Sequence, residues 1–174
     1  MRYILLSGAV RPLGPNAEAV VFAAARDDHL NTRIRPALAR GKWVICDRFA
    51  DSTRIYQGVV GKVEPQAIRA MERIIVGDTK PDLTLILDVP AREGLKRAAE
   101  RRGRGGADRF EAEALAFHEK LRDGFLTLAA NEPDRCVLID ATSPKEEVAE
   151  QIWRVVSRKL DPASAPIAFE DSKA

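Results

Sequence analysis

Residues 44–58 read Val-Ile-Cys-Asp-Arg-Phe-Ala-Asp-Ser-Thr-Arg-Ile-Tyr-Gln-Gly, and this run decides the fold. A short apolar strand, expected at residues 43–46, ends in an adjacent acid and base, Asp47 and Arg48. In an open α/β sheet, ligands bind beyond the carboxyl ends of the strands. The planar guanidinium fork of an arginine suits a phosphate there. For the two residues alone, a structural ion pair is an equally good explanation.

Two further apolar runs, residues 83–89 and 136–139, also end at or near an acid. They do not alternate with polar residues, which is typical of parallel strands covered on both faces. Helical patterns separate the runs: residues 16–38, 64–76, 91–102, 110–130 and a last helix that follows Ser143. Strands that alternate with helices predict an α/β fold with a parallel sheet.

The composition indicates a single soluble domain. The chain has 174 residues and a formal charge of only +2, which does not favour a nucleic-acid or membrane partner. No apolar run approaches the roughly 20 residues that span a bilayer, so we expect a cytoplasmic protein. The two cysteines, Cys46 and Cys136, lie in separate apolar runs and do not indicate a metal site or a disulfide. We expect a domain over residues 1–160 and a disordered Pro-, Ala- and Ser-rich tail over 161–174.

The order Asp-Arg-Phe, then Ser-Thr, then Tyr-Gln-Gly resembles the bacterial thymidylate kinases, and the resemblance runs from about residue 2 to about residue 160. It implies the P-loop NTPase-like fold of the nucleoside monophosphate kinases, a three-layer α/β/α arrangement with a parallel sheet. The implied reaction transfers the γ-phosphoryl group of ATP, bound with Mg²⁺, to dTMP and gives dTDP. The resemblance also implies a homodimer.

Phe22 and Arg26 are four residues apart in an expected helix, so they share a face. Spacing alone favours a simpler reading, in which Phe22 belongs to the core and Arg26 is solvated. The segment Val-Phe-Ala-Ala-Ala-Arg, residues 21–26, is similar to the thymidylate kinase segment that holds the base. The resemblance therefore implies that Phe22 stacks on thymine and that Arg26 reaches a base oxygen.

The resemblance gives Arg48 the acceptor phosphate, and Asp47 would orient Arg48 or lie near the metal shell. It assigns four more residues to the dTMP pocket: Ser52, Thr53, Tyr56 and Gln57. Thr53 would face the thymine edge and Tyr56 would lie against the deoxyribose. Ser52 and Gln57 would support the pocket through hydrogen bonds.

Residues 97–111 hold five arginines around a Gly-rich segment: Arg97, Arg101, Arg102, Arg104 and Arg109. Most such basic runs are solvated loops. Bacterial thymidylate kinases have a basic lid followed by Asp-Arg-x-Glu, and residues 108–111 here read Asp-Arg-Phe-Glu. We interpret the segment as a lid whose arginines stabilise charge during phosphoryl transfer. Arg101, Arg102 and Arg104 are the candidates for contact with the transferred group.

The sequence contains no Gly-x-x-x-x-Gly-Lys-(Ser/Thr) loop, which in the family follows the first strand and wraps the donor phosphates. We expect a strand–loop–helix–strand unit of about 40 residues to precede residue 1 in the intact polypeptide. No metal ligand is assigned within the chain, and Mg²⁺ would arrive with ATP. Two alternatives stay open: a non-catalytic nucleotide-binding fragment or degenerate kinase, and a kinase for a related deoxynucleotide or deoxynucleoside.

Overall fold

The computed structural model describes residues 10–102 and 113–160. The predicted lid residues Arg104 and Arg109 and the predicted tail lie outside these ranges. The described elements, in chain order, are η1 Arg11–Leu13, α2 Gly14–His29, η2 Leu30–Ile34, α3 Arg35–Ala39, α4 Ala50–Thr53, η3 Arg54–Val60, α5 Pro65–Ile75, β1 Thr84–Asp88, α6 Ala91–Arg102, α7 Leu115–Asn131, β2 Cys136–Asp140 and α8 Lys145–Leu160.

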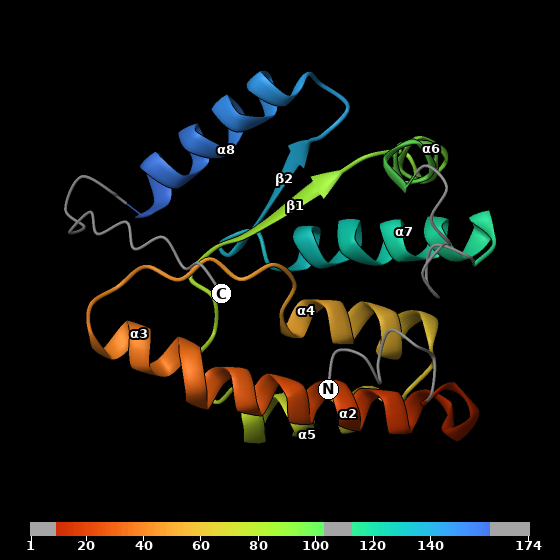
Figure 1. The fold of residues 1–174 in the computed structure, drawn as a ribbon, viewed down its shortest axis with the longest axis vertical. Helices are drawn as coiled ribbons and strands as arrows, with labels where there is room; N and C mark the ends of the chain where they lie inside the picture. Colours follow the sequence, from red (N-terminus) through yellow and green to blue (C-terminus); the bar gives the residue numbers. More distant parts are fainter. Residues whose placement is uncertain (1–9, 103–112, 161–174) are drawn as a thin grey trace.

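The two strands β1 and β2 pair in parallel, in a register that places Asp88 opposite Asp140 at their carboxyl ends. The predicted parallel strands near residues 83–89 and 136–139 are therefore confirmed. Figure 1 shows α8 and α7 on opposite sides of this strand pair. Below α7, the helical run of α4 and η3 lies between α7 and a layer made by α2 and α5.

The predicted strand at residues 43–46 is wrong for this structure, because residues 42–46 have no regular secondary structure. A β-strand needs a hydrogen-bonded neighbour. The two described strands pair with each other, and within the described ranges no further strand lies beside residues 43–46. The side chains of Trp43 and Val44 are exposed, and that of Ile45 is 98% exposed.

The predicted helix over residues 16–38 is a continuous helical run over residues 14–39. It widens into a π turn at η2, where the Arg35 N–H donates to the Leu30 carbonyl. Pro36 follows directly and has no N–H to continue the ordinary ladder, which accounts for the change of register. Leu30 and Ile34 are buried, whereas Leu38, one turn further on, is exposed.

The apolar interior joins the layers through the α4–η3 run. Ile55 belongs to a cluster with Ile86 of β1 and Leu121 and Leu128 of α7. On the other side, Ala50 packs with residues of η2 and with the residue that follows α5. The α4–η3 run is thus held between the sheet side and the helical layer. None of the helices within the described ranges combines the length and the apolarity that a membrane crossing requires.

Candidate functional site

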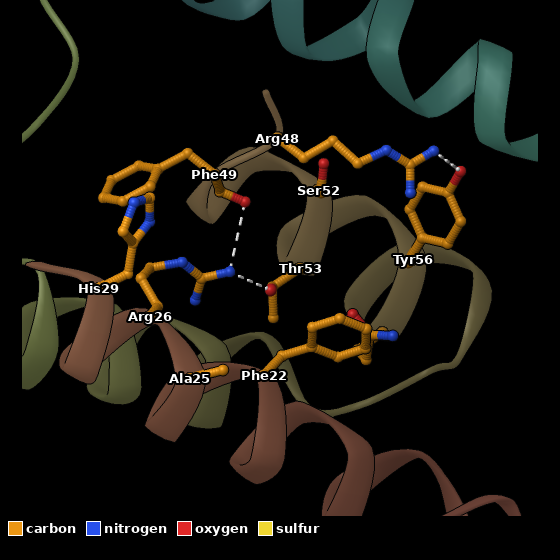
Figure 2. Close-up of a pocket in the computed structure, with 10 residues that line it drawn as sticks. Phe22, Ala25, Arg26, His29, Arg48, Phe49, Ser52, Thr53 and Tyr56 are labelled. Atoms are coloured by element: carbon orange, nitrogen blue, oxygen red, sulfur yellow. Dashed lines mark hydrogen bonds between the residues drawn. The ribbon is translucent and has the colours of Figure 1, made fainter. Parts of the chain in front are cut away.

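A cavity of about 210 Å³ lies between α2 and residues 48–57, which we term the pocket stretch (Figure 2). Ten residues line it: Phe22, Ala25, Arg26, His29, Arg48, Phe49, Ser52, Thr53, Tyr56 and Gln57. All seven residues that the sequence predicted for a dTMP pocket are among them. Two segments that are well separated in the chain therefore meet at one site.

Three lining residues were not predicted: Ala25, His29 and Phe49. Ala25 and His29 lie three and seven residues after Phe22, so they share its face of α2. Helical spacing could have indicated them. Phe49 directly follows the Asp-Arg pair, and its role depends on how closely the pocket stretch approaches α2.

Arg26 connects the two walls of the cavity. Its Nη2 donates a hydrogen bond to Thr53 Oγ1 at 2.6 Å and one to the Phe49 carbonyl at 3.3 Å. Its Cζ also lies 5.5 Å from the centroid of the Phe49 ring. Burial lowers the pKa of the Arg26 guanidinium, and the negative charge of Glu72 opposes that shift. Figure 2 shows the guanidinium between the two walls, with Phe22 one turn away on α2.

Arg48 has a backbone φ of 65°, in the left-handed region that a non-glycine residue seldom adopts. Its Nη2 donates to the Tyr56 hydroxyl at 2.8 Å, and its Cζ lies 4.9 Å from the centroid of the Tyr56 ring. The Tyr56 ring in turn packs against Phe117 of α7 in a T-shaped arrangement, with ring centroids 6.3 Å apart. The strained backbone and the aromatic support together fix a charged donor at one side of the cavity (Figure 2).

Of the pocket-stretch residues that line the cavity, Thr53 and Gln57 are buried and Ser52 is half-buried. They fall on one side of the α4–η3 run because their spacing is close to one helical turn. Thr53 was predicted to face the edge of the thymine ring. In the structure its hydroxyl accepts a hydrogen bond from Arg26, so both side chains would meet the base at that edge. The cavity therefore has aromatic and hydrogen-bonding groups at its α2 end and a guanidinium on its opposite wall.

The other predicted residues do not line this cavity. Asp47 is exposed beside Arg48. Arg97 of α6 pairs with Glu93 and donates to the Ala141 carbonyl, at 2.6 Å, in the loop after β2. Arg101 is exposed near the end of α6, Arg102 ends that helix, and Arg104 lies outside the described residues. The structure therefore brings the predicted nucleotide residues together and places the described part of the predicted lid on a separate helix.

Each strand ends in an aspartate, Asp88 in β1 and Asp140 in β2, and the carboxylate oxygens of both accept hydrogen bonds. Arg122 donates to Asp88 through two bonds, Nε to Oδ1 at 2.7 Å and Nη2 to Oδ2 at 2.8 Å. These bonds hold the pKa of Asp88 below its usual range. Hydrogen bonds from the Thr142 hydroxyl and N–H lower the pKa of Asp140. Within residues 10–102 and 113–160, no group of three or more His, Cys, Asp or Glu side chains is arranged to hold a metal ion.

Comparison with known proteins identifies the family. The family model described as thymidylate kinase matches residues 1–152. The chain is 56% identical over 167 residues to a thymidylate kinase of Bradyrhizobium diazoefficiens, covering 96% of this chain and 73% of that protein. It is 55% identical over 165 residues to a thymidylate kinase of Nitrobacter winogradskyi, covering 95% of this chain and 72% of the relative.

A solved structure gives the same result for the fold. The crystal structure of thymidylate kinase from Ehrlichia chaffeensis is similar with a TM-score of 0.64 and 28% sequence identity, over 85% of this chain and 73% of that chain. The predicted fold class, a P-loop NTPase-like α/β fold, is thereby confirmed. The chain belongs to the thymidylate kinase family.

Proposed function

We propose that this chain is a dTMP kinase and that it binds dTMP in the cavity between α2 and the pocket stretch. One observation carries the assignment of the site: the seven residues predicted from sequence for dTMP line a single cavity. The reaction is the transfer of the γ-phosphoryl group of ATP to dTMP, which gives dTDP. Membership of the thymidylate kinase family supports this reaction.

The base occupies the α2 end of the cavity in this proposal. Phe22 stacks on the thymine ring, and Arg26 donates to a ring carbonyl oxygen with its position fixed by Thr53. A guanidinium donates only, so it suits the carbonyl oxygens of thymine. Thr53 and Gln57 are buried, so a base without matching polar groups would leave them poorly paired.

The phosphate of dTMP is held by Arg48 in this proposal. Its guanidinium offers several N–H groups, of which one bonds to Tyr56. Tyr56 lies against the deoxyribose and Ser52 hydrogen-bonds near it, while Asp47 orients Arg48 or lies near the metal shell. Such a site catalyses transfer by positioning the acceptor oxygen and stabilising charge, with no covalent intermediate.

ATP enters as its magnesium complex, which we treat as a substrate. Arg97, Arg101, Arg102 and Arg104 are proposed as lid residues, and the last three are the candidates for stabilising charge on the transferred phosphoryl group. The resemblance also supports a kinase domain over residues 1–160, a homodimer and a cytoplasmic location. These assignments stay predictions.

The Arg48→Ala substitution tests the assignment of the site. Two charge-assisted hydrogen bonds to a phosphate contribute about 3–5 kcal/mol, so the loss of kcat/KM for dTMP should be roughly 10²- to 10⁴-fold. The matched control is Arg69→Ala, which removes an exposed arginine of α5 that does not line the cavity. Turnover is measured with ATP and dTMP, and binding of dTMP is measured by calorimetry.

Near-normal turnover of Arg48→Ala would contradict the proposed site. Comparison of dTMP with dUMP, dCMP and dGMP tests the base assignment, and a preference for dGMP would contradict the roles of Phe22 and Arg26. Binding of dTMP without any turnover in the protein as isolated from its native cells would contradict the catalytic assignment.

A further inference from the structure

Residues of the α4–η3 run that do not line the cavity belong to a network of charged and polar groups. Its members come from five parts of the fold: Asp51, Arg54, Glu72, Thr84, Glu132 and Arg135. None of them lines the cavity. The network therefore lies outside the cavity but contacts the helical run that carries the proposed dTMP ligands.

Asp51 and Arg135 form the centre of this network. Arg135 donates from Nη1 to Asp51 Oδ2 at 2.8 Å and from Nη2 to Asp51 Oδ1 at 2.9 Å, so the guanidinium meets the carboxylate in a planar fork. Thr84, the first residue of β1, donates to Asp51 Oδ2 at 3.3 Å and accepts from Arg135 Nη1 at 2.7 Å. The side chain of Asp51 is only 9% exposed.

A second set of ion pairs also connects the α4–η3 run to the turn between α7 and β2, through Arg54 and Glu132. Arg54 donates to Glu132 Oε1 at 2.6 Å, and Glu132 Oε2 accepts from Arg135 Nη2 at 2.7 Å. Glu132 and Arg135 flank the tight turn that leads from α7 into β2. Burial alone would raise the pKa of Asp51, but the bonds and charge of Arg135, with Arg54 and Thr84, hold it below its ordinary value. The carboxylate is therefore ionised at neutral pH and attracts the fork.

We infer that Asp51 and Arg135 are positioning residues for dTMP, because they fix the rotation of the helical run that carries Ser52, Thr53 and Tyr56. This inference rests on the proposed function of the cavity. A bidentate fork fixes direction as well as distance, which an apolar contact does not. Successive residues of a helix point about 100° apart, so a carboxylate clamped at Asp51 determines where the next two side chains point.

Two observations make this clamp more than a general support of the fold. The segment that enters the pocket stretch, residues 42–46, has no strand partner among the described residues, so the sheet does not orient it there. On the same side of the run, Ile55 makes apolar contacts with β1 and α7. Such contacts resist a sliding of the helical run along its neighbours less than the bidentate Asp51–Arg135 pair does. Binding of dTMP needs Thr53 and Tyr56 in register with Arg26 on α2, and the fork supplies that register.

The test compares the binding of dTMP with stability. Asp51→Asn keeps the shape of the side chain and removes its charge, and Arg135→Lys keeps the charge and removes the fork. Both should raise the Kd and KM for dTMP about tenfold and leave kcat at saturating dTMP within about twofold. The KM for ATP should not change. The control is Lys159→Gln, which removes a charged donor to the Pro133 and Asp134 carbonyls of the same turn without touching the pocket stretch.

A purely structural role predicts a different result. Destabilisation that lowers the folded fraction reduces the apparent kcat while the Kd and KM for dTMP stay constant, and Lys159→Gln should leave the Kd and KM for dTMP unchanged. If Asp51→Asn or Arg135→Lys shows the same behaviour, the inference is overturned. If either fails to fold, Thr84→Val removes the hydroxyl that bridges both partners and should raise the Kd for dTMP about threefold, and an unchanged Kd overturns the inference.

Failure of the proposed function gives a separate result. An unsubstituted protein that does not bind dTMP contradicts the assignment of the cavity and the inference together. If the unsubstituted protein binds dTMP and the Asp51 and Arg135 variants bind it with the same affinity, only the positioning roles of Asp51 and Arg135 are contradicted.

Discussion

The hydrogen bond between Arg26 and Thr53 should contribute to both stability and the affinity for dTMP, and Thr53→Val isolates it. The substitution replaces the hydroxyl with a methyl group at nearly constant volume in a buried side chain. It removes the acceptor at 2.6 Å from Arg26 Nη2 and leaves only the Phe49 carbonyl at 3.3 Å. Because burial has already removed much of the water around this guanidinium, the lost acceptor is not readily replaced.

A hydrogen bond to a charged group contributes about 1.5–3 kcal/mol, so we expect Thr53→Val to lower the free energy of unfolding by about 2 kcal/mol. For a chain of this length, that corresponds to a decrease in Tm of about 4–8 °C. Arg26 would also lose its fixed orientation toward the base. We therefore expect the Kd for dTMP to rise about tenfold, which corresponds to about 1.4 kcal/mol.

Thermal unfolding and titration calorimetry with dTMP measure the two effects. The control is Thr32→Val, which makes the same chemical change at an exposed hydroxyl that donates to the Asp28 carbonyl at 2.8 Å. That control should leave the affinity for dTMP unchanged, and it should change the free energy of unfolding by no more than about 0.5 kcal/mol. Equal Tm and equal Kd for Thr53→Val and the unsubstituted protein would refute the reasoning.

Two further predictions concern stability. Gly124→Ala in α7 should lower Tm by about 2–4 °C, because the added Cβ would lie 2.9 Å from Ile55 Cγ2. The cost of this overpacking exceeds the gain in helix propensity from alanine. A higher Tm would contradict the close approach of α7 to η3. The contribution of Asp51 to stability is complete above its unfolded pKa of about 4 and is lost as pH falls through its lower folded pKa. Urea unfolding between about pH 5 and about pH 3 should therefore show a smaller loss of stability in Asp51→Asn than in the unsubstituted protein, and parallel curves would exclude this contribution.

The parts of the fold that sequence predicted well are those that depend on local signals. The periodic segment over residues 91–102 matches α6 at both ends, and the segment over 64–76 contains α5, whose first residue is Pro65. The strand at 43–46 failed because its residues are suited to a strand but pairing requires a neighbour, which a local pattern does not supply. Exposed Leu38 lies on the same helical face as buried Leu30 and Ile34, since periodicity indicates which residues share a face but not how far the covering element extends.

In the candidate site, too, residues in local motifs were predicted, and contacts between distant segments were missed. The motif around Asp47 and Arg48 and the segment with Phe22 and Arg26 led to the cavity through their resemblance to the thymidylate kinases, since a short motif is local information, whereas spacing alone favoured a core Phe22 and a solvated Arg26. Phe49 was missed, since its contact with Arg26 depends on the approach of two distant segments. The pairing of Asp51 with Arg135 joins residues 84 positions apart, and charged residues are too common for one such pair to stand out in a sequence.

The left-handed backbone at Arg48 has a consequence for engineering this protein. A non-glycine residue in that conformation is destabilised by about 1 kcal/mol or more relative to glycine, which adopts it without a steric penalty. A library selected only for thermal stability or expression should therefore enrich glycine at position 48. Those variants would have gained stability by losing the proposed phosphate-binding arginine, so any directed evolution of this chain needs activity as a second criterion.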